Sequence, residues 1–156
     1  MFLARVDNRL IHGQIIETWI PFAGSRLLIV ANDELSVDII RQEIMSLAVP
    51  AGIGTTFVEV DKVSFFVSEC CRVIEHSQLL VLFASCCDAL RAFEDGLAME
   101  SVNIGNIHYG PGKRQLCAHV ALSAEDELCL RRFISLRVEL DFRCIPSEPA
   151  YIRSWW

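Results

Sequence analysis

Lysine is scarce in this sequence, and the charge balance is acidic. The 156 residues include only two lysines, and 14 basic side chains stand against 20 acidic ones, for a formal net charge of −6. Proteins that bind nucleic acids or anionic membranes through electrostatics present a basic stripe or patch instead. The composition therefore argues against both kinds of partner.

Long apolar runs are also missing. The longest nearly uncharged stretch, Leu79–Cys87, has about half of the ~20 residues that a helix needs to cross a bilayer. Near the N-terminus, Arg5, Asp7 and Arg9 interrupt any apolar segment of a secretory signal. We therefore expect a cytoplasmic protein, whose 53% hydrophobic residues form a core covered from both sides.

Motifs for metals, thiol redox chemistry and nucleotides are absent as well. No C-x-x-C occurs, and the histidines lack metal-ligand spacing. The glycine-rich segment 105–113 fails the spacing of a nucleotide-binding P-loop. We expect no metal and no organic cofactor. In a reducing compartment we expect the cysteines to be small buried hydrophobic residues; they are Cys70, Cys71, Cys86, Cys87, Cys117, Cys129 and Cys144.

Short apolar runs typical of strands alternate with segments of helical period. Four segments place apolar residues on one helix face, and one of them contains Val37, Ile40, Ile44 and Leu47. The expected strands are Phe2–Val6, Arg26–Val30, Gly54–Val60, Leu79–Ala84, Ser101–Ile104, Gln115–Leu122 and Val138–Ile145.

Some of these strands are apolar at every position, notably Leu27–Val30 and Leu79–Phe83. Such strands are buried on both faces, which is typical of a parallel sheet between helices. We therefore predict an α/β fold, with an open, doubly wound, mostly parallel sheet of about seven strands and helices on both faces. The length suits a single domain over 1–156. Residues 147–156, ending in Trp155-Trp156, form the predicted C-terminal tail.

The loop after the first strand is the strongest candidate site, because ligands bind at the carboxyl ends of strands in such folds. Arg5, Asp7, Arg9 and His12 stand within eight residues, and Gly13 lies where a helix should begin. Unpaired N–H groups and the helix dipole make a helix start an anion site. Arginines could grip phosphate oxygens, while the aspartate could orient an imidazole N–H or hold an arginine.

The same surroundings should keep the imidazole of His12 neutral and therefore nucleophilic. The loop thus suggests a histidine that accepts a phosphoryl group or binds an anion. A purely structural interpretation stays open at this point, in which His12 is a satisfied histidine near a helix start. The arginines would then pair with surface carboxylates.

The loop also resembles a known signature. Residues 5–14, RVDNRLIHGQ, are similar to the R-x-D-x-R-L-I-H-G-Q signature of the mannose/sorbose family of phosphotransferase-system IIB components. Further similarities extend over essentially the whole chain. They are Asn32-Asp33-Glu34, the A-x-P-x-G pattern at 48–52, Asn103-Ile104-Gly105 of an N-x-G-G pattern, and the G-K-x-Q pattern at 112–115.

The resemblance implies a cytoplasmic phosphocarrier, a phosphotransferase peripherally associated with a membrane transporter. His12 would accept a phosphoryl group at Nδ1 from a phosphohistidine of enzyme IIA. It would pass the group to a sugar that enters through the membrane components IIC and IID. Arg5, Asp7 and Arg9 correspond to the signature residues around the acceptor. Gly13 and Gln14 correspond to the pair at the helix start, expected to bind phosphate or partner.

Two positions depart from the family pattern. An N-P or T-P common in the family is replaced by Ala84-Ser85-Cys86, where Ser85 could offer a hydroxyl to phosphate or simply cap a helix. The second glycine of N-x-G-G is Asn106. Two other functions remain alternatives: a regulatory phosphoprotein that uses the same phosphorylation of His12 without transport, and a conventional enzyme with His12 as general base.

Overall fold

The structure is a computed structural model that describes residues 1–149. Apart from residues 147–149, the predicted tail with Trp155 and Trp156 lies outside the described residues.

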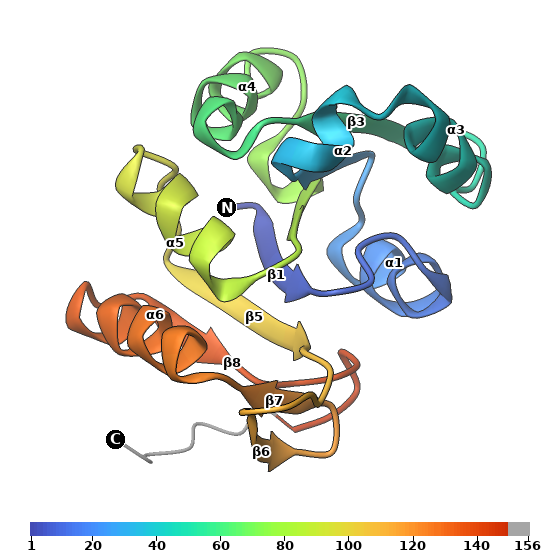
Figure 1. The fold of residues 1–156 in the computed structure, drawn as a ribbon. Helices are drawn as coiled ribbons and strands as arrows, with labels where there is room; N and C mark the ends of the chain where they lie inside the picture. Colours follow the sequence, from blue (N-terminus) through green and yellow to red (C-terminus); the bar gives the residue numbers. More distant parts are fainter. Residues whose placement is uncertain (150–156) are drawn as a thin grey trace.

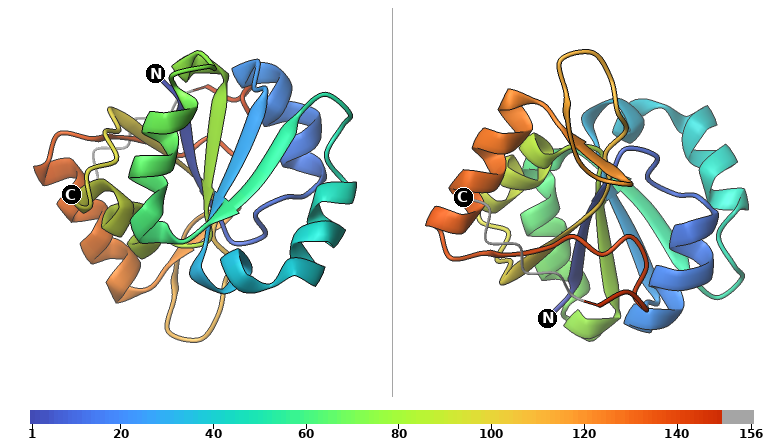
Figure 2. Two further views of the ribbon diagram at one scale, coloured as in Figure 1. Left: turned by 90° about the horizontal axis from the view of Figure 1, so that it is seen from above. Right: turned by 90° about the horizontal axis from the view of Figure 1, so that it is seen from below.

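Within residues 1–149, six parallel strands form one sheet in the order β3-β2-β4-β1-β5-β8 (Figures 1 and 2). This confirms the predicted fold class. The strands are β1 (Leu3–Asp7), β2 (Leu27–Ala31), β3 (Gly54–Val58), β4 (Leu79–Phe83), β5 (Ser101–Asn106) and β8 (Glu139–Asp141).

Helices cover both faces of this sheet (Figure 2). The π-helix η1 (Ile15–Trp19), α1 (Ile20–Ala23), α2 (Asp33–Val37) and α3 (Ile39–Leu47) lie on one face. On the other lie α4 (Val63–Cys70), α5 (Cys86–Glu94) and α6 (Ala124–Ser135), while η2 (Val60–Lys62) and η3 (His76–Gln78) are short 3₁₀ turns. No helix within the described residues is both long and apolar enough to span a membrane.

The central strand β4 shows why its sequence is apolar throughout. Leu79, Val81 and Phe83 belong to the hydrophobic cluster on one face, and Leu80 and Leu82 belong to the cluster on the other. Successive side chains of a strand point to opposite faces. Because a hydrophobic cluster covers each face, all five side chains are fully buried. A strand covered on both sides has no polar face.

The position of the site follows from the point in the sheet at which the chain leaves two neighbouring strands toward opposite faces. Neighbouring strands β1 and β4 pair in parallel. However, β1 leads into η1 and α1 on one face and β4 leads into α5 on the other. Loops that leave adjacent strands in opposite directions open a crevice at their carboxyl ends. The loop after β1 lies at this edge of the sheet.

One expected strand is wrong in detail. The run 115–122 is a hairpin of β6 (Arg114–Cys117) and β7 (Val120–Leu122), which forms a separate two-stranded antiparallel sheet. A tight turn at Ala118 and His119 folds the run back on itself. The main sheet therefore has six strands instead of about seven, and the hairpin is attached through backbone hydrogen bonds with Ile107, directly after β5.

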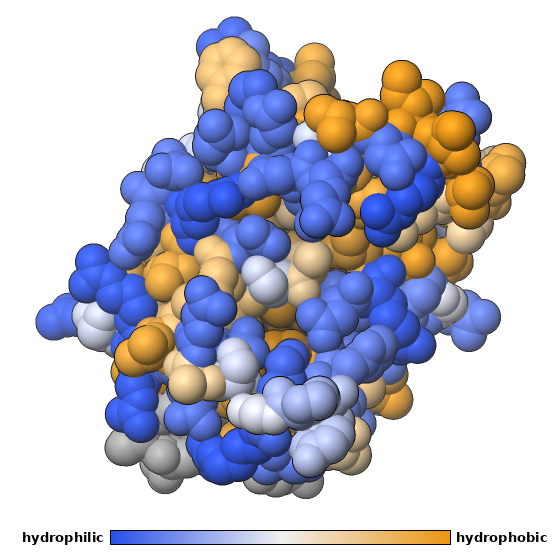
Figure 3. All heavy atoms as spheres, viewed as in Figure 1, coloured by the Kyte–Doolittle hydropathy of each residue, from blue (hydrophilic) through white to orange (hydrophobic). Residues whose placement is uncertain are grey.

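The apolar stripe on α2 and α3 faces solvent. Val37, Ile40, Ile44 and Leu47 are 62–86% exposed, and Figure 3 shows the hydrophobic surface at the position of α3. One polar contact caps the start of α3, and a second ties α3 to α2. Asp38 accepts a hydrogen bond from the backbone N–H of Arg41, and Gln42 Nε2 donates to the carbonyl of Leu35. The spacing therefore indicates the helix, but not the direction of its apolar face.

This difference leads to a test with two isoleucines. Ile29→Ala should lower the free energy of unfolding by about 2–5 kcal/mol, because Ile29 is fully buried in the sheet. Ile40→Ala, at a position that is 71% exposed, should change it by less than about 0.5 kcal/mol. Urea unfolding measures both. Equal losses would contradict the orientation of α3.

Candidate active site

The loop after β1 is a tight turn organised by Asp7. Its Oδ1 accepts a hydrogen bond from the backbone N–H of Arg9 at 3.1 Å, and its carbonyl accepts one from Leu10 at 3.0 Å. Leu10 has a left-handed backbone with φ of 55°, which costs an L-residue about 1–2 kcal/mol. Its side chain is buried among the apolar residues beneath η1, and that burial offsets the strain.

Asn8 attaches this loop to the neighbouring strands. Its Nδ2 donates to the carbonyl of Ala84, directly after β4, at 2.7 Å. Its Oδ1 accepts from the backbone N–H of His108, beyond β5, at 2.8 Å. One exposed amide side chain thus links three loops at the carboxyl edge of the sheet.

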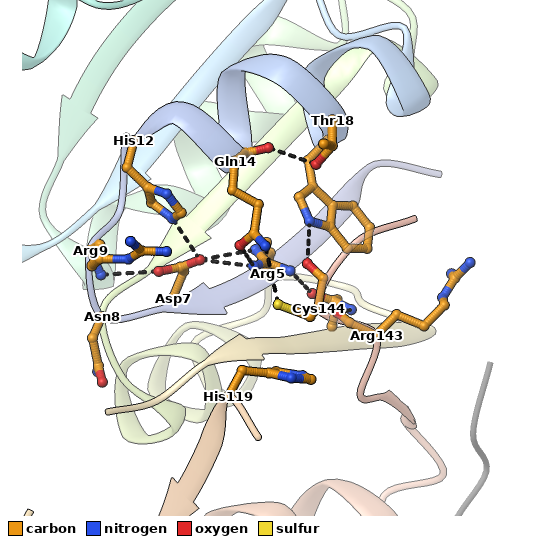
Figure 4. A network of polar contacts seen from close by, with 12 residues as sticks. Arg5, Asp7, Asn8, Arg9, His12, Gln14, Thr18, His119, Arg143 and Cys144 are labelled. Atoms are coloured by element: carbon orange, nitrogen blue, oxygen red, sulfur yellow. Dashed lines mark hydrogen bonds and ion pairs between the residues drawn. The ribbon is translucent and has the colours of Figure 1, made fainter. Parts of the chain in front are cut away.

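Arg5 lies entirely inside the protein, at the centre of a polar network (Figure 4). Its guanidinium donates to Asp7 Oδ2 through Nη2 at 2.8 Å and through Nε at 3.3 Å. It also donates to Asn103 Oδ1 at 2.5 Å and to Gln14 Oε1 at 3.1 Å. Burial lowers the pKa of Arg5 although Asp7 opposes that effect, but a guanidinium keeps its charge even so.

The guanidinium also lies against an aromatic ring and against the backbone of β5. It lies over the ring of Trp19, 4.7 Å from the centroid, in a cation–π contact. It also lies so close to β5 that a Cβ at Gly105 would be 1.9 Å from the Arg5 Cζ atom. Only glycine can occupy that position while Arg5 keeps its place.

Asp7 connects this buried charge to His12. The Oδ2 atom that accepts from Arg5 also lies 3.0 Å from His12 Nε2. Burial alone would raise the pKa of Asp7, but the hydrogen bond with His12 and the charge of Arg5 outweigh it, and the pKa lies below its ordinary value. Asp7 is therefore a buried carboxylate at neutral pH. It turns His12 Nε2 inward, which leaves Nδ1 as the nitrogen directed away from the carboxylate.

Arg9 is the exposed arginine of the loop. Its Nε and Nη2 donate to the side-chain oxygen of Asn106, at 3.0 and 2.9 Å, when the amide is oriented to suit both groups. Asn106 itself is buried. The two arginines thus have different environments, because Arg5 is enclosed and Arg9 lies at the protein surface beside His12.

The sequence model of the PTS system sorbose subfamily IIB component, where PTS is the phosphotransferase system, matches residues 1–151. The chain belongs to this family. That assignment confirms the resemblance carried by the loop, and with it a role in phosphotransfer during sugar uptake.

Known relatives of this IIB component cover nearly its whole length. It is 33% identical to the N-acetylgalactosamine-specific phosphotransferase enzyme IIB component 2 of Escherichia coli, over 95% of this chain and 92% of the relative. It is 29% identical to the mannose-specific EIIAB component of Escherichia coli, over 94% of this chain and 45% of that protein. The crystal structure of the IIBSor domain of the Klebsiella pneumoniae sorbose permease aligns with a TM-score of 0.86 at 30% identity, covering 97% and 93% of the two chains.

Gln14, Ser85 and Gly13 are the three further residues that the sequence predicts to bind phosphate or a partner, and each has different contacts in the IIB component. Gln14 is bound at both ends, with Oε1 on Arg5 and Nε2 on the sulfur of Cys144, so it supports the buried network. Ser85 Oγ accepts from the Asp88 N–H at 3.0 Å and caps α5. At Gly13 a Cβ would meet only a side-chain oxygen at 3.9 Å, so the fold itself does not require glycine there.

The network also contains residues that the sequence does not mark as site residues. Asn103 donates through Nδ2 to the carbonyls of Asp141 and Arg143, and Trp19 Nε1 donates to the carbonyl of Cys144. The segment after β8 therefore closes over the buried side of the site. The N-x-G pattern marked Asn103 only as part of a resemblance, and no sequence signal marked Cys144. Within residues 1–149, no three His, Cys, Asp or Glu side chains are grouped to hold a metal ion.

Removal of the Asp7 charge should show how much this carboxylate stabilises the folded IIB component. Asp7→Asn should lower the free energy of unfolding by about 3–5 kcal/mol at pH 7, because it leaves the fully buried Arg5 charge without its counter-ion. The pKa of Asp7 is lowered in the folded state, so this contribution is complete above the unfolded pKa and is lost as the pH falls through the folded one. The deficit should shrink below about pH 4.

Glu69→Gln provides the matched control. Glu69 pairs with Arg72 at 3.0 Å on the surface, and its loss should change the free energy of unfolding by less than about 1 kcal/mol at any pH. Urea unfolding of both variants across pH makes the comparison. Equal deficits for the two variants would contradict a special role for the buried pair.

Proposed function

We propose that His12 carries the phosphoryl group of this IIB component. It accepts the group from a phosphohistidine of enzyme IIA and passes it to a hydroxyl of a sugar entering through the membrane components IIC and IID. The observation that supports this most directly is the 3.0 Å contact between His12 Nε2 and the buried carboxylate of Asp7. It holds Nε2 and leaves Nδ1 to accept the phosphoryl group.

The contact favours the tautomer with its proton on Nε2. A carboxylate accepts hydrogen bonds and cannot donate, so the N–H belongs on Nε2, and Nδ1 keeps its lone pair. That lone pair attacks phosphorus in line with the donor nitrogen, so one N–P bond forms while the other breaks. The ring becomes more positive as the bond forms, and the negative charge of Asp7 stabilises it.

The arginines have separate roles in this proposal. Arg9, exposed on the loop, neutralises the phosphoryl oxygens during transfer. Arg5 is a positioning residue, because its complete burial keeps it from the incoming group while its bonds to Asp7 orient His12. Gly13 allows the backbone of a partner or its phosphate to approach the start of the helix. Ser85, at the start of α5, remains a proposed phosphate or partner contact of this edge.

The family and the relatives support the proposed partners. The name of the mannose-specific EIIAB relative pairs the IIA and IIB functions in one protein, which supports a IIA phosphohistidine as donor. In this proposal the protein acts on the sugar at the cytoplasmic side of a membrane transporter. Neither transfer in this proposal requires a metal or an organic cofactor, because positioning and charge stabilisation supply the catalysis.

A reconstituted relay tests the acceptor. The IIB component is incubated with labelled phosphoenolpyruvate, enzyme I, the histidine phosphocarrier protein and a cognate IIA. The expected product is an acid-labile, base-stable label that His12→Ala reduces to background. His108→Ala, a change at an exposed histidine beyond β5, should keep full labelling. Label that persists in His12→Ala would overturn the proposal.

A double-mutant cycle tests the pairing of Arg9 with Asn106. Asn106→Gly should slow phosphoryl transfer to His12 by about tenfold, since it frees a guanidinium held by a charged hydrogen bond. In an Arg9→Ala background the same change should have little further effect. Single-turnover transfer rates from phosphorylated IIA measure all four proteins. Equal slowing in both backgrounds would show that Asn106 acts independently of Arg9.

A further inference from the structure

Two free cysteines on neighbouring helices have their sulfur atoms in contact. Cys87, in the first turn of α5, and Cys129, in the middle of α6, have Sγ atoms 2.9 Å apart. Neither residue belongs to the His12 network. Cys129 is buried and Cys87 is partly exposed, so the pair is reachable from solvent on the Cys87 side.

The separation is short for two thiols that serve only as packing. Apolar side chains in contact keep their heavy atoms about 3.5–4.5 Å apart. A disulfide has its sulfur atoms at about 2.05 Å. The two sulfur atoms therefore need to approach by less than about 1 Å to reach bonding distance.

Contacts elsewhere along the two helices hold this geometry. The rings of Phe93 and Phe133 meet edge to face, with centroids 6.0 Å apart. Arg132 and Glu94 form an ion pair at 3.1 Å near the ends of the same helices. Because α5 and α6 are fixed to each other at several levels, the thiols are held together by the fold, which gives their reaction a high effective concentration.

We propose that Cys87 and Cys129 are an oxidation site, at which a peroxide converts the two thiols into an intramolecular disulfide between α5 and α6. The partly exposed Cys87 sulfur attacks a peroxide oxygen and becomes a sulfenic acid, as the O–O bond breaks and the first water leaves. The Cys129 sulfur then attacks the Cys87 sulfur and displaces the second water. Two thiols and one hydrogen peroxide give one disulfide and two waters, so the sulfurs lose the two electrons that the peroxide gains.

The surroundings predict slow formation of this cross-link. Burial raises the pKa of Cys87 and of Cys129, and the contact between the thiols raises that of Cys87 further. A small thiolate population slows attack on peroxide. The pair lies on the face of the sheet opposite η1 and α1, and its oxidation should leave phosphorylation of His12 intact.

Peptide mapping of the peroxide-treated full chain tests the proposal. Trypsin releases residues 73–91, which contain Cys86 and Cys87, and residues 115–131, which contain Cys117 and Cys129. Mass spectrometry without reduction should find these peptides joined. Cys87→Ser and Cys129→Ser should each reduce the joined product at least about tenfold, whereas Cys86→Ala and Cys117→Ser should leave it unchanged.

Thermal unfolding provides a second measurement in case a buried serine disturbs the fold. Oxidised wild-type protein should unfold at a temperature several degrees higher than the reduced protein, because the bond restrains the unfolded chain. Oxidised Cys87→Ser, changed at the partly exposed position, should show no such rise. The proposal is overturned if the treated wild type shows no joined peptide, or if the joined product survives in Cys87→Ser.

Discussion

The buried positive charge of Arg5 is the constraint on which the rest of the site depends. An ion removed from water costs several kcal/mol unless partners surround it. Asp7, Asn103 and Gln14 supply those partners from three parts of the chain, and the ring of Trp19 covers the guanidinium face. Because one carboxylate oxygen serves both Arg5 and His12, the contacts that compensate the buried charge also orient the histidine.

The fold class could be predicted because its strongest signal is local. A strand with five apolar residues in succession, as in β4, is buried on both faces wherever it lies. The hairpin over β6 and β7 was missed because its turn, at Ala118 and His119, lacks the glycine, asparagine or proline that usually marks one. The direction of the exposed stripe on α3 could not be predicted because it depends on tertiary contacts of the helix, such as that of Gln42 with the carbonyl of Leu35 in α2.

The sequence predicts which residues form the site, but not which of them are buried. Arg5, Asp7, Arg9 and His12 are close in sequence, so one loop brings them together. The sequence suggests two arginines that grip one anion, whereas the structure encloses Arg5 and leaves Arg9 exposed. That difference arises from residues about a hundred positions away, chiefly the Asn103–Asn106 segment of β5, whose register against β1 no local pattern reveals.

The central claim is that Asp7 holds the Nε2–H of His12 and leaves Nδ1 as the acceptor. Nitrogen-15 NMR of the imidazole ring tests it most directly, because a protonated, an unprotonated and a phosphorylated ring nitrogen have different chemical shifts. In the neutral ring of His12 the proton should reside on Nε2, and after phosphorylation the phosphorus should be bound to Nδ1. A proton on Nδ1 in the free protein, or phosphorus on Nε2 in the phosphorylated one, would contradict the account.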